Sequence, residues 1–332
     1  MALETPYLLF LGDAADALAA KVAIGIQYWR PQNCVGQLRL PGCNADCGLT
    51  DMTIEEARAA GAKTVVVGVA NRGGVISDAW VEVLTEALDA GMDVAAGLHN
   101  RLNDVPALTE AAVRNGRTLH DVRHPTETFN VANGIKRSGK RLLAVGTDCS
   151  CGKMYTTLAI EQEMQSRGMA ADFRATGQTG ILICGSGTSI DAVVSDFISG
   201  AVEAMSPDND PDHWDIIEGQ GSLFHASYAG VTTGLIHGAQ PDALVLCHEP
   251  TRTHMRGLPT YSLPDLATCM DANLRTAKLT NPDARFVAMA INTAALSEDE
   301  AGEYLARVEG EHGLPAVDPV RQGVGRIVDA VS

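Results

Sequence analysis

The chain has 332 residues, of which 45% are hydrophobic and 20% charged, and its formal net charge at pH 7 is −16. This length fits two domains better than one. The acidic balance excludes a protein built to bind DNA or RNA, because the phosphate backbone repels such a surface. The eight cysteines form no C-x-x-C pair, so no metal site is expected, and reduced thiols are expected.

Strand and helix patterns alternate through the first part of the chain. Short apolar runs predict strands, and the segments with helical spacing between them predict helices. The expected strands are 7–11, 35–40, 63–69, 93–96 and 118–122, and the expected helices are 14–26, 54–60, 77–90 and 106–115. Such alternation is typical of an α/β fold with a parallel sheet, and we assign it to a domain at 1–125.

A polar, glycine-containing stretch at 126–140 is expected to link this domain to a second one at 141–332. The alternation resumes there and predicts a second parallel sheet with helices around it. The expected strands are 141–145, 172–176, 214–218, 243–247, 286–291 and 316–317, and the expected helices are 153–167, 190–205, 264–279 and 298–312.

The segment from Gly146 to Met154 has the features of a phosphate-binding loop. It follows a buried strand pattern, precedes a helix pattern, and carries Lys153 directly before that helix. This arrangement points backbone N–H groups and a helix N-terminus at an anion. The residues expected to contact the anion are Gly146, Thr147, Asp148, Cys149, Ser150, Cys151, Gly152, Lys153 and Met154.

One part of a nucleotide-hydrolysing loop is missing. The position after the lysine usually carries a Ser or Thr hydroxyl that binds Mg²⁺, and here it is Met154. A thioether is a poor ligand for this hard cation, which prefers oxygen. The loop is therefore expected to hold phosphate without metal and to be poorly suited to hydrolysing a nucleoside triphosphate.

The second domain resembles dethiobiotin synthetase and its P-loop relatives. The resemblance rests on Gly-Thr-Asp-x-x-x-Gly-Lys at 146–153, on Glu218-Gly219-Gln220-Gly221, and on the loop 176–180 at the place of the second-strand substrate loop. It implies, as the alternative function, an ATP- and Mg²⁺-dependent ligase or kinase acting on a small carboxylate. Met154 is the departure that speaks against this alternative.

The whole chain resembles the D-glutamate N-acetyltransferases more closely. The segments that carry this resemblance are 68–74, 97–99, the cysteine-containing loop with Lys153-Met154, 218–222 and 247–252. The resemblance implies a Rossmann-like N-terminal domain fused to a P-loop domain. It also implies transfer of acetyl from acetyl-CoA to the amine of D-glutamate, in D-amino-acid catabolism.

The chemistry of the residues agrees with that implication. Coenzyme A carries a pyrophosphate and a 3′-phosphate, which a loop with Lys153 can hold without metal. We expect Gln178 and Gln220 to contribute to the same cosubstrate site. The amine must lose a proton before it attacks the thioester, so a base is needed, and the candidates are Glu218 and His225, with Lys153 assisting catalysis.

Cys149 and Cys151 lie inside the loop and admit two roles. One of them could carry the acetyl group as a thioester. The interpretation we favour is that small side chains are needed where the loop wraps a phosphate, because no histidine lies near them in sequence and transfer to an amine can proceed directly.

The two carboxylates of D-glutamate call for fixed donors, and guanidinium groups match carboxylates with paired hydrogen bonds. Four arginines lie near predicted strand ends or in the loops that follow, where open α/β sheets bind ligands. As a group they are the expected substrate receptors: Arg72, Arg174, Arg252 and Arg256.

Neither a signal peptide nor a membrane span is indicated by the sequence. We therefore expect a cytoplasmic enzyme with a small-molecule substrate and no membrane partner. Enzymes of this size and class are often dimers or larger, so a homo-oligomer is expected.

Overall fold

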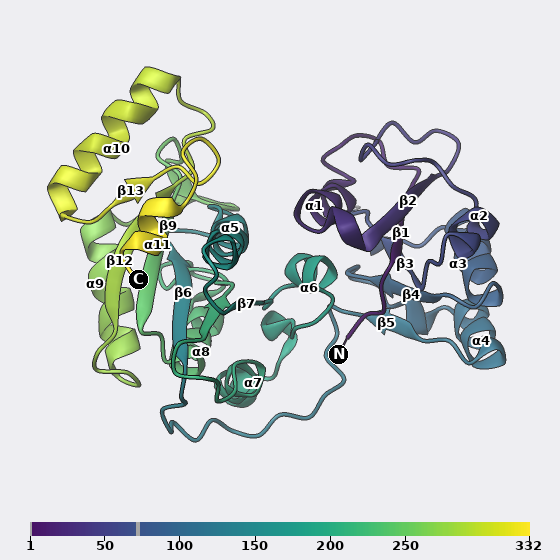
Figure 1. The fold of residues 1–332 in the computed structure, drawn as a ribbon, viewed down its shortest axis with the longest axis horizontal. Coiled ribbons are helices and arrows are strands. Elements are labelled where there is room, and N and C mark those ends of the chain that lie inside the picture. The colour runs from purple at the N-terminus through teal and green to yellow at the C-terminus, as the bar shows by residue number, and fades with distance from the viewer. Residues whose placement is uncertain (1, 71–73) are drawn as a thin grey trace. The chain divides into compact units, whose positions relative to one another are not determined.

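The computed structural model describes residues 2–70 and 74–332. It divides into two compact units (Figure 1). The first comprises the chain up to Thr126 together with Gly177–Ala192, and the second comprises Glu127–Thr176 and Val193–Ser332. The excursion of 177–192 into the first unit adds two crossings to the one expected at 126–140, and the sequence pattern gave no sign of them.

The first unit is built on a five-stranded parallel sheet in the order β2-β1-β3-β4-β5. All five strands were predicted, and β1, β3 and β4 are buried along their whole length. Chain order reverses between β1 and β3, which is where open α/β sheets form a crevice at the carboxyl ends of their strands. The strands are β1 Tyr7–Gly12, β2 Cys34–Arg39, β3 Thr64–Val67, β4 Asp93–Ala96 and β5 Leu119–Asp121.

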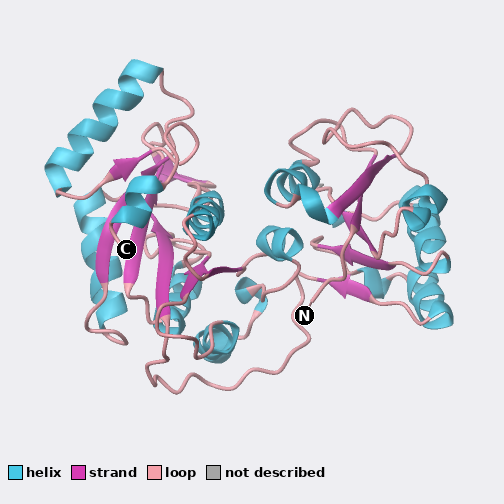
Figure 2. Ribbon diagram, viewed as in Figure 1, coloured by secondary structure: helices cyan, strands magenta, loops and turns pink. Residues whose placement is uncertain are grey.

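Helices flank this sheet (Figure 2). The α-helices are α1 Lys21–Trp29, α2 Ile54–Ala59, α3 Asp78–Asp89, α4 Pro106–Asn115 and α6 Gln178–Cys184. Short 3-10 turns occur at Pro31–Asn33, Leu102–Asp104 and Ile190–Ala192. The predicted start of the first helix at residue 14 was wrong. Asp16 there accepts a hydrogen bond from the backbone N–H of Ala19 at 2.8 Å, a local bond that competes with helix formation.

A six-stranded parallel sheet forms the second unit, in the order β13-β12-β9-β6-β8-β7. Its strands, all predicted, are β6 Lys140–Gly146, β7 Ala171–Arg174, β8 Trp214–Ile217, β9 Ala243–His248, β12 Arg285–Ile291 and β13 Ala316–Val317. An antiparallel hairpin of β10 His254–Met255 and β11 Leu258–Ser262 was not predicted. The central strand β6 lies between β8 and β9, so residues following these three strands meet at one edge.

The helices of the second unit are α5 Lys153–Ser166, α7 Ile198–Met205, α8 Ala229–Ala239, α9 Leu266–Lys278, α10 Glu298–His312 and α11 Gly325–Asp329, with a 3-10 turn at Ser195–Phe197. The continuous helix predicted over 190–205 was wrong. The chain crosses from one unit to the other after Ala192, and Val194 there has φ −57° and ψ 135°, an extended conformation that interrupts a helix.

Helix α8 escaped prediction because it is rich in glycine, a poor helix former. The packing explains the glycines. A Cβ at Gly238 would lie 2.3 Å from the carbonyl oxygen of Ser199, and one at Gly234 would lie 2.6 Å from Cγ2 of Ile198. Small residues thus let α8 approach α7 closely.

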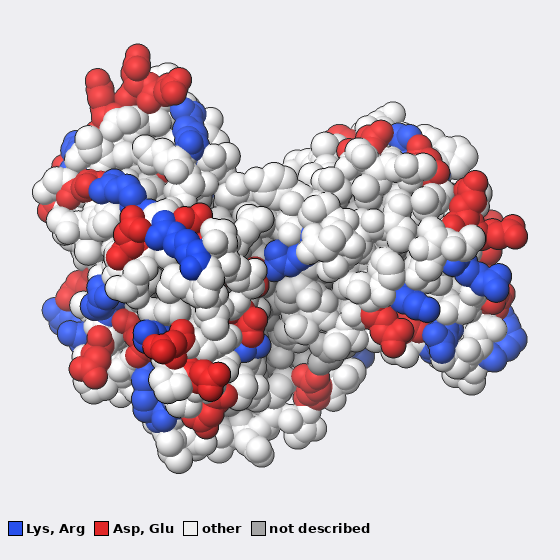
Figure 3. Space-filling model, in the orientation of Figure 1, with Lys and Arg blue, Asp and Glu red and all other residues white. Residues whose placement is uncertain are grey.

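Acidic and basic side chains are interspersed over the outer face drawn in Figure 3. Over the whole chain 41 Asp and Glu residues outnumber 25 Lys and Arg residues. An anionic ligand must therefore be held by local groups and not by the overall field. Within residues 2–70 and 74–332, no helix combines the length and apolar character needed to span a bilayer.

Candidate active site around the phosphate-binding loop

The predicted phosphate-binding loop connects β6 to α5 in the second unit. Gly152 stands before the helix with φ 104°, and Ser150 has φ 52°, a left-handed conformation that non-glycine residues seldom adopt. The first turn of α5 leaves N–H groups without partners inside the helix, as every helix start does. The predicted strand–loop–helix context for anion binding is therefore present.

Asp148 anchors the loop from inside. Its side chain is fully buried, and its carboxylate accepts hydrogen bonds from the backbone N–H of Cys149 at 2.7 Å and of Arg256 at 2.8 Å. Arg252 Nη1 donates to the same carboxylate at 2.7 Å. Burial acts to raise the pKa of Asp148, but the bonds from Arg252 and from the two backbone N–H groups outweigh it, and the pKa lies below its usual value.

Arg252 also clamps the loop backbone. Its guanidinium donates to the carbonyl oxygens of Cys149 at 2.6 Å and Ser150 at 3.2 Å, and pairs with Glu249. We expected Arg252 to receive a substrate carboxylate. In this structure the guanidinium N–H groups of Arg252 donate to the loop and to two acidic side chains, so Arg252 holds the loop in its conformation.

Lys153 is folded back into the loop. Its Nζ donates to the carbonyl oxygen of Asp148 at 2.8 Å and lies 3.8 Å from Sγ of Cys151, and the residue is 6% exposed. Gly219 makes room for it, because a Cβ there would lie 1.7 Å from the carbonyl oxygen of Ala144 and 2.9 Å from Cδ of Lys153. The next residue, Met154, occupies the second position of α5.

Glu218 directly follows β8, the strand beside β6, and so lies at the same edge as the loop. It is 4% exposed, and its Oε2 accepts a hydrogen bond from the backbone N–H of Thr176 at 2.9 Å. The Thr176 hydroxyl donates to the Glu218 carbonyl oxygen at 2.7 Å and accepts from Nε2 of Gln220 at 3.2 Å. A buried carboxylate oriented by a backbone N–H is suited to holding or taking a proton.

His225 lies beside the loop, which sequence spacing did not indicate. Ligand atoms of Asp148, Cys149 and His225 are all within 4.8 Å of one another. The backbone N–H of Ser227 donates to Nδ1 of His225 at 3.1 Å, so Nε2 carries the proton and donates to the carbonyl oxygen of Arg256 at 3.1 Å. Both ring nitrogens are engaged, which makes His225 a poor candidate base.

The same three residues are spaced to reach one metal ion, but their present contacts serve other purposes. Arg252 neutralises Asp148, and the ring nitrogens of His225 bind backbone groups. Burial raises the pKa of the Cys149 thiol, with Lys153 and Arg252 acting in the opposite direction. A neutral thiol is a weak nucleophile and a weak ligand.

The remaining predicted residues are dispersed. Arg174 on β7 pairs with the buried Asp215 at 2.8 Å, a contact that holds the sheet. Arg256 is exposed, and no described residue bonds its guanidinium. Gln178 opens α6 in the first unit, and so belongs to a different body from the loop. Arg72 lies outside the described residues.

Sequence reasoning missed His248, which ends β9. Its Nδ1 lies 2.9 Å from Oγ1 of Thr147, and burial together with the charge of Arg252 lowers its pKa from 6.5 to about 4. The ring is therefore neutral at physiological pH, and its Nδ1 shares a hydrogen bond with the Thr147 hydroxyl. The segment 247–252 carries part of the family resemblance, but nothing in its spacing indicates that His248 contacts the loop.

This depressed pKa predicts a loss of stability in acid. Between pH 6.5 and about 4 the unfolded His248 binds a proton that the folded one refuses, so the free energy of unfolding falls as pH falls through this window. The pKa difference corresponds to about 3 kcal/mol at most. Urea unfolding of the protein and of His248→Asn at about pH 7 and about pH 5 should show a smaller pH effect in the variant. Equal pH effects would contradict the assignment.

Both units match known proteins. Residues 38–125 match the family model described as the DUF1611_N Rossmann-like domain, and residues 130–328 match the P-loop domain of unknown function DUF1611_C. The chain is 63% identical over 330 residues to a D-glutamate N-acetyltransferase of Tritonibacter scottomollicae and 50% identical over 328 residues to one of a Pseudoalteromonas species, with 99% of each chain covered in both cases. A crystal structure of a DUF1611 family protein from Anabaena variabilis is 32% identical, covers 98% of this chain and 99% of that one, and superposes with a TM-score of 0.82.

Proposed function

We propose a function from one premise: the chain belongs to the DUF1611 family, in which a Rossmann-like domain precedes a P-loop domain. The protein is an acyltransferase that moves an acetyl group to the amine of D-glutamate, giving N-acetyl-D-glutamate. The observation that carries this conclusion is the identity of 63% and 50%, over 99% of the chain, to two proteins named D-glutamate N-acetyltransferase.

Acetyl-CoA is the donor in this proposal, and the loop 146–154 holds one of its phosphate groups. Backbone N–H groups at the start of α5 and the ammonium of Lys153 supply the positive environment. The backbone N–H of Arg256 donates to Asp148 of the loop. Because the guanidinium of Arg256 is exposed, this arginine is the one best situated to add a second cation. No metal takes part.

The chemical step is attack of the neutral amine on the thioester carbonyl. Glu218 takes the proton from the ammonium group, the C–N bond forms, and a tetrahedral intermediate carries the negative charge on oxygen. Gln220 or loop N–H groups stabilise that oxyanion. The C–S bond then breaks, the attacking nitrogen gives up its second proton, and the departing thiolate of CoA takes that proton up. The engaged ring nitrogens of His225 favour Glu218 as the base.

The alternative is a ligase or kinase that consumes ATP with Mg²⁺ at the same loop. Met154 speaks against it, because phosphoryl transfer relies on Mg²⁺ to neutralise developing charge and the usual hydroxyl ligand is replaced by a thioether. Calorimetric titration with ATP and Mg²⁺, and separately with acetyl-CoA, distinguishes the two. Metal-dependent ATP binding without acetyl-CoA binding would favour the alternative.

The function is tested by incubating the protein with acetyl-CoA and a panel of D- and L-amino acids. The expected result is release of CoA thiol that depends on D-glutamate, accompanied by N-acetyl-D-glutamate in equal amount. The product should be measured by mass spectrometry, because the protein's own eight cysteines react with thiol reagents. Absence of acetylated product with every acceptor would overturn the proposal.

Direct transfer makes a prediction for Cys149. Because its thiol is kept neutral by burial and the neighbouring imidazole has no unused nitrogen, we expect Cys149→Ala to keep kcat/KM within a few-fold of the wild type. Intact-mass measurement after incubation with acetyl-CoA alone should show no acetyl adduct. An acetylated Cys149 and an inactive variant would instead establish an acetyl-enzyme route. Cys184→Ala, in the first unit, is the matched control.

We also propose a cytoplasmic location and a homo-oligomeric assembly, dimer or larger. The cytoplasmic location is supported by the donor, because acetyl-CoA is an intracellular metabolite. The homo-oligomeric assembly is proposed because α/β enzymes of this size are often dimers or larger. Size-exclusion chromatography with light scattering tests the assembly directly.

A further inference from the structure

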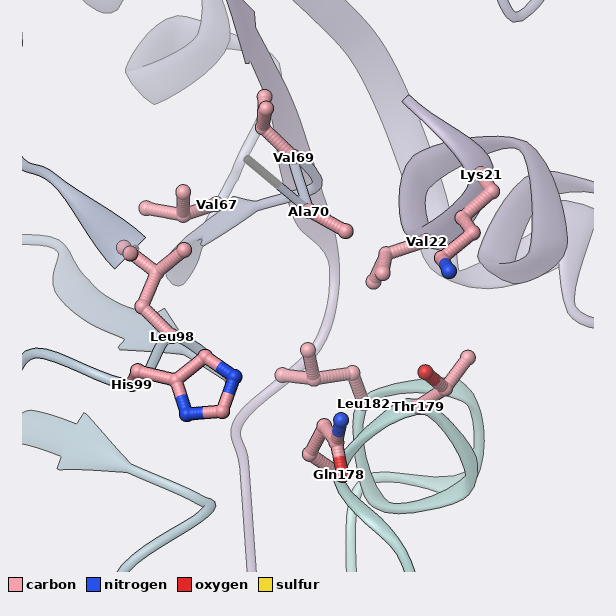
Figure 4. A pocket seen from close by; sticks show the side chains of 12 residues that line it. Lys21, Val22, Val67, Val69, Ala70, Leu98, His99, Gln178, Thr179 and Leu182 are labelled. Atoms are coloured by element: carbon pink, nitrogen blue, oxygen red, sulfur yellow. The ribbon is translucent and has the colours of Figure 1, made fainter. Parts of the chain in front are cut away.

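A cavity of about 200 Å³ lies at the carboxyl edge of the sheet in the first unit. Its walls come from the residues after β3, the residues after β4, the start of α1 and the start of α6 (Figure 4). This is the edge at which chain order reverses between β1 and β3, the usual ligand crevice of an open parallel sheet. The residues of the proposed acetyl-CoA loop do not contribute to it.

The wall of the cavity combines apolar and polar side chains. Figure 4 shows Val67 and Leu98 near His99, Val22 beside Lys21, and Leu182 beside Gln178 and Thr179. The four apolar residues are buried, whereas the four polar ones are exposed or half-buried. Within the described chain, no residue forms a hydrogen bond or ion pair with any of these four polar side chains. Their donors are therefore available to a ligand.

Two glycines keep the cavity in its present shape. A Cβ at Gly97 would lie 3.0 Å from both Cβ and Cγ of Gln178, and a Cβ at Gly74 would lie 2.8 Å from the backbone nitrogen of His99. Gly74 also has φ 64°, which a larger residue would adopt only with strain. Side chains at these positions would displace polar residues that line the cavity.

Size and charge together indicate the class of ligand. The volume lies below the ~300–1,000 Å³ of pockets for drug-sized ligands, which excludes coenzyme A and suits a molecule of amino-acid size. In a chain with 41 acidic residues, none of the twelve described lining residues is acidic, and one is a lysine. An ammonium, an amide, a hydroxyl and an imidazole beside apolar side chains match a small anion with a short aliphatic chain.

We propose that this cavity binds the acceptor, D-glutamate, with Lys21 receiving one of its carboxylates. Gln178 and Thr179 supply further hydrogen bonds, and the aliphatic part of the amino acid packs on Val22 and Leu182. The proposal rests on the proposed function for the identity of the amino acid. It moves acceptor binding away from Arg174 and Arg252, whose guanidinium groups are engaged in ion pairs.

The test compares Lys21→Met with Lys63→Met in the full chain. Both lysines are exposed and belong to the first unit, but Lys63 precedes β3 at the opposite edge of the sheet. D-Glutamate is titrated calorimetrically into protein saturated with CoA, and KM is measured for both substrates. Lys21→Met is expected to weaken D-glutamate binding about 10-fold or more, with the KM for acetyl-CoA unchanged. Lys63→Met should match the wild type.

Gly97→Ala provides a second variant that leaves every charge in place. It should weaken D-glutamate binding by crowding Gln178, while its melting temperature shows that the unit still folds. Unchanged D-glutamate binding in both variants overturns the proposal, as does a rise in KM for acetyl-CoA alone. Because wild-type product formation is measured separately, a protein that acetylates D-glutamate but ignores both substitutions refutes the cavity and not the function.

Discussion

Replacing Lys153 with methionine is expected to raise the KM for acetyl-CoA about 10- to 100-fold, the range for loss of a hydrogen bond to a charged group. Methionine keeps most of the aliphatic stem that packs beside Gly219 and removes only the ammonium. If that ammonium meets a phosphate of CoA, affinity for the donor falls, whereas the KM for D-glutamate stays near its wild-type value. Steady-state kinetics with each substrate varied in turn separates the two.

The matched control is Lys278→Met, because Lys278 is exposed in the last turn of α9 and is remote in sequence from the loop. Its kinetics should equal those of the wild type. Since Lys153 also donates to the carbonyl oxygen of Asp148, the melting temperature of Lys153→Met must be compared as well. A stable variant with an unaltered KM for acetyl-CoA would remove the loop from the donor site.

Replacing Glu218 with glutamine is expected to lower kcat roughly 10²- to 10⁴-fold, the range for loss of a positioned general base. Glutamine has nearly the same shape, and its carbonyl oxygen can still accept the hydrogen bond from Thr176 that holds this side chain. Structure and substrate affinity should therefore be kept while proton acceptance is lost. The effect belongs in kcat and not in either KM.

A pH profile makes this test specific. If Glu218 is the base, the fall of kcat/KM on the acidic side that is due to its protonation should be absent from the residual activity of Glu218→Gln. Glu163→Gln neutralises a half-buried carboxylate of α5 that pairs with Arg167, and this variant should retain full activity and the wild-type profile. Comparable rates for Glu218→Gln and the wild type would reject the assignment of the general base to Glu218.

The sequence was sufficient for the sheets and for the loop, because both depend on local patterns. A buried parallel strand is a short apolar run such as Leu142–Val145, and the loop is a contiguous stretch whose glycines and lysine have fixed roles. The failures have equally local causes. The glycines of α8 lower its helix propensity, and their benefit, close packing on α7, appears only in three dimensions.

The candidate site was predicted less completely, because its key contacts join residues from different strands. Spacing placed Arg252 near a strand end but could not show that its guanidinium would be taken by Asp148 and by loop carbonyls. It also gave no sign that His225 lies next to Cys149. For the same reason the sequence did not predict the cavity that includes Lys21 and Gln178. Its walls come from two segments of the chain that the first strands of the second unit separate in sequence.

Because residues 177–192 return to the first unit, the chain cannot be divided into two intact domains by one cut at the linker. Helix α6 buries Ile181, Leu182 and Ile183 and packs against α1. A fragment ending near Thr126 would lack this helix, expose apolar surface of α1 to water and forfeit part of the cavity wall. Splitting the gene at the obvious linker should therefore yield insoluble halves, and neither half is a module that could be exchanged between relatives on its own.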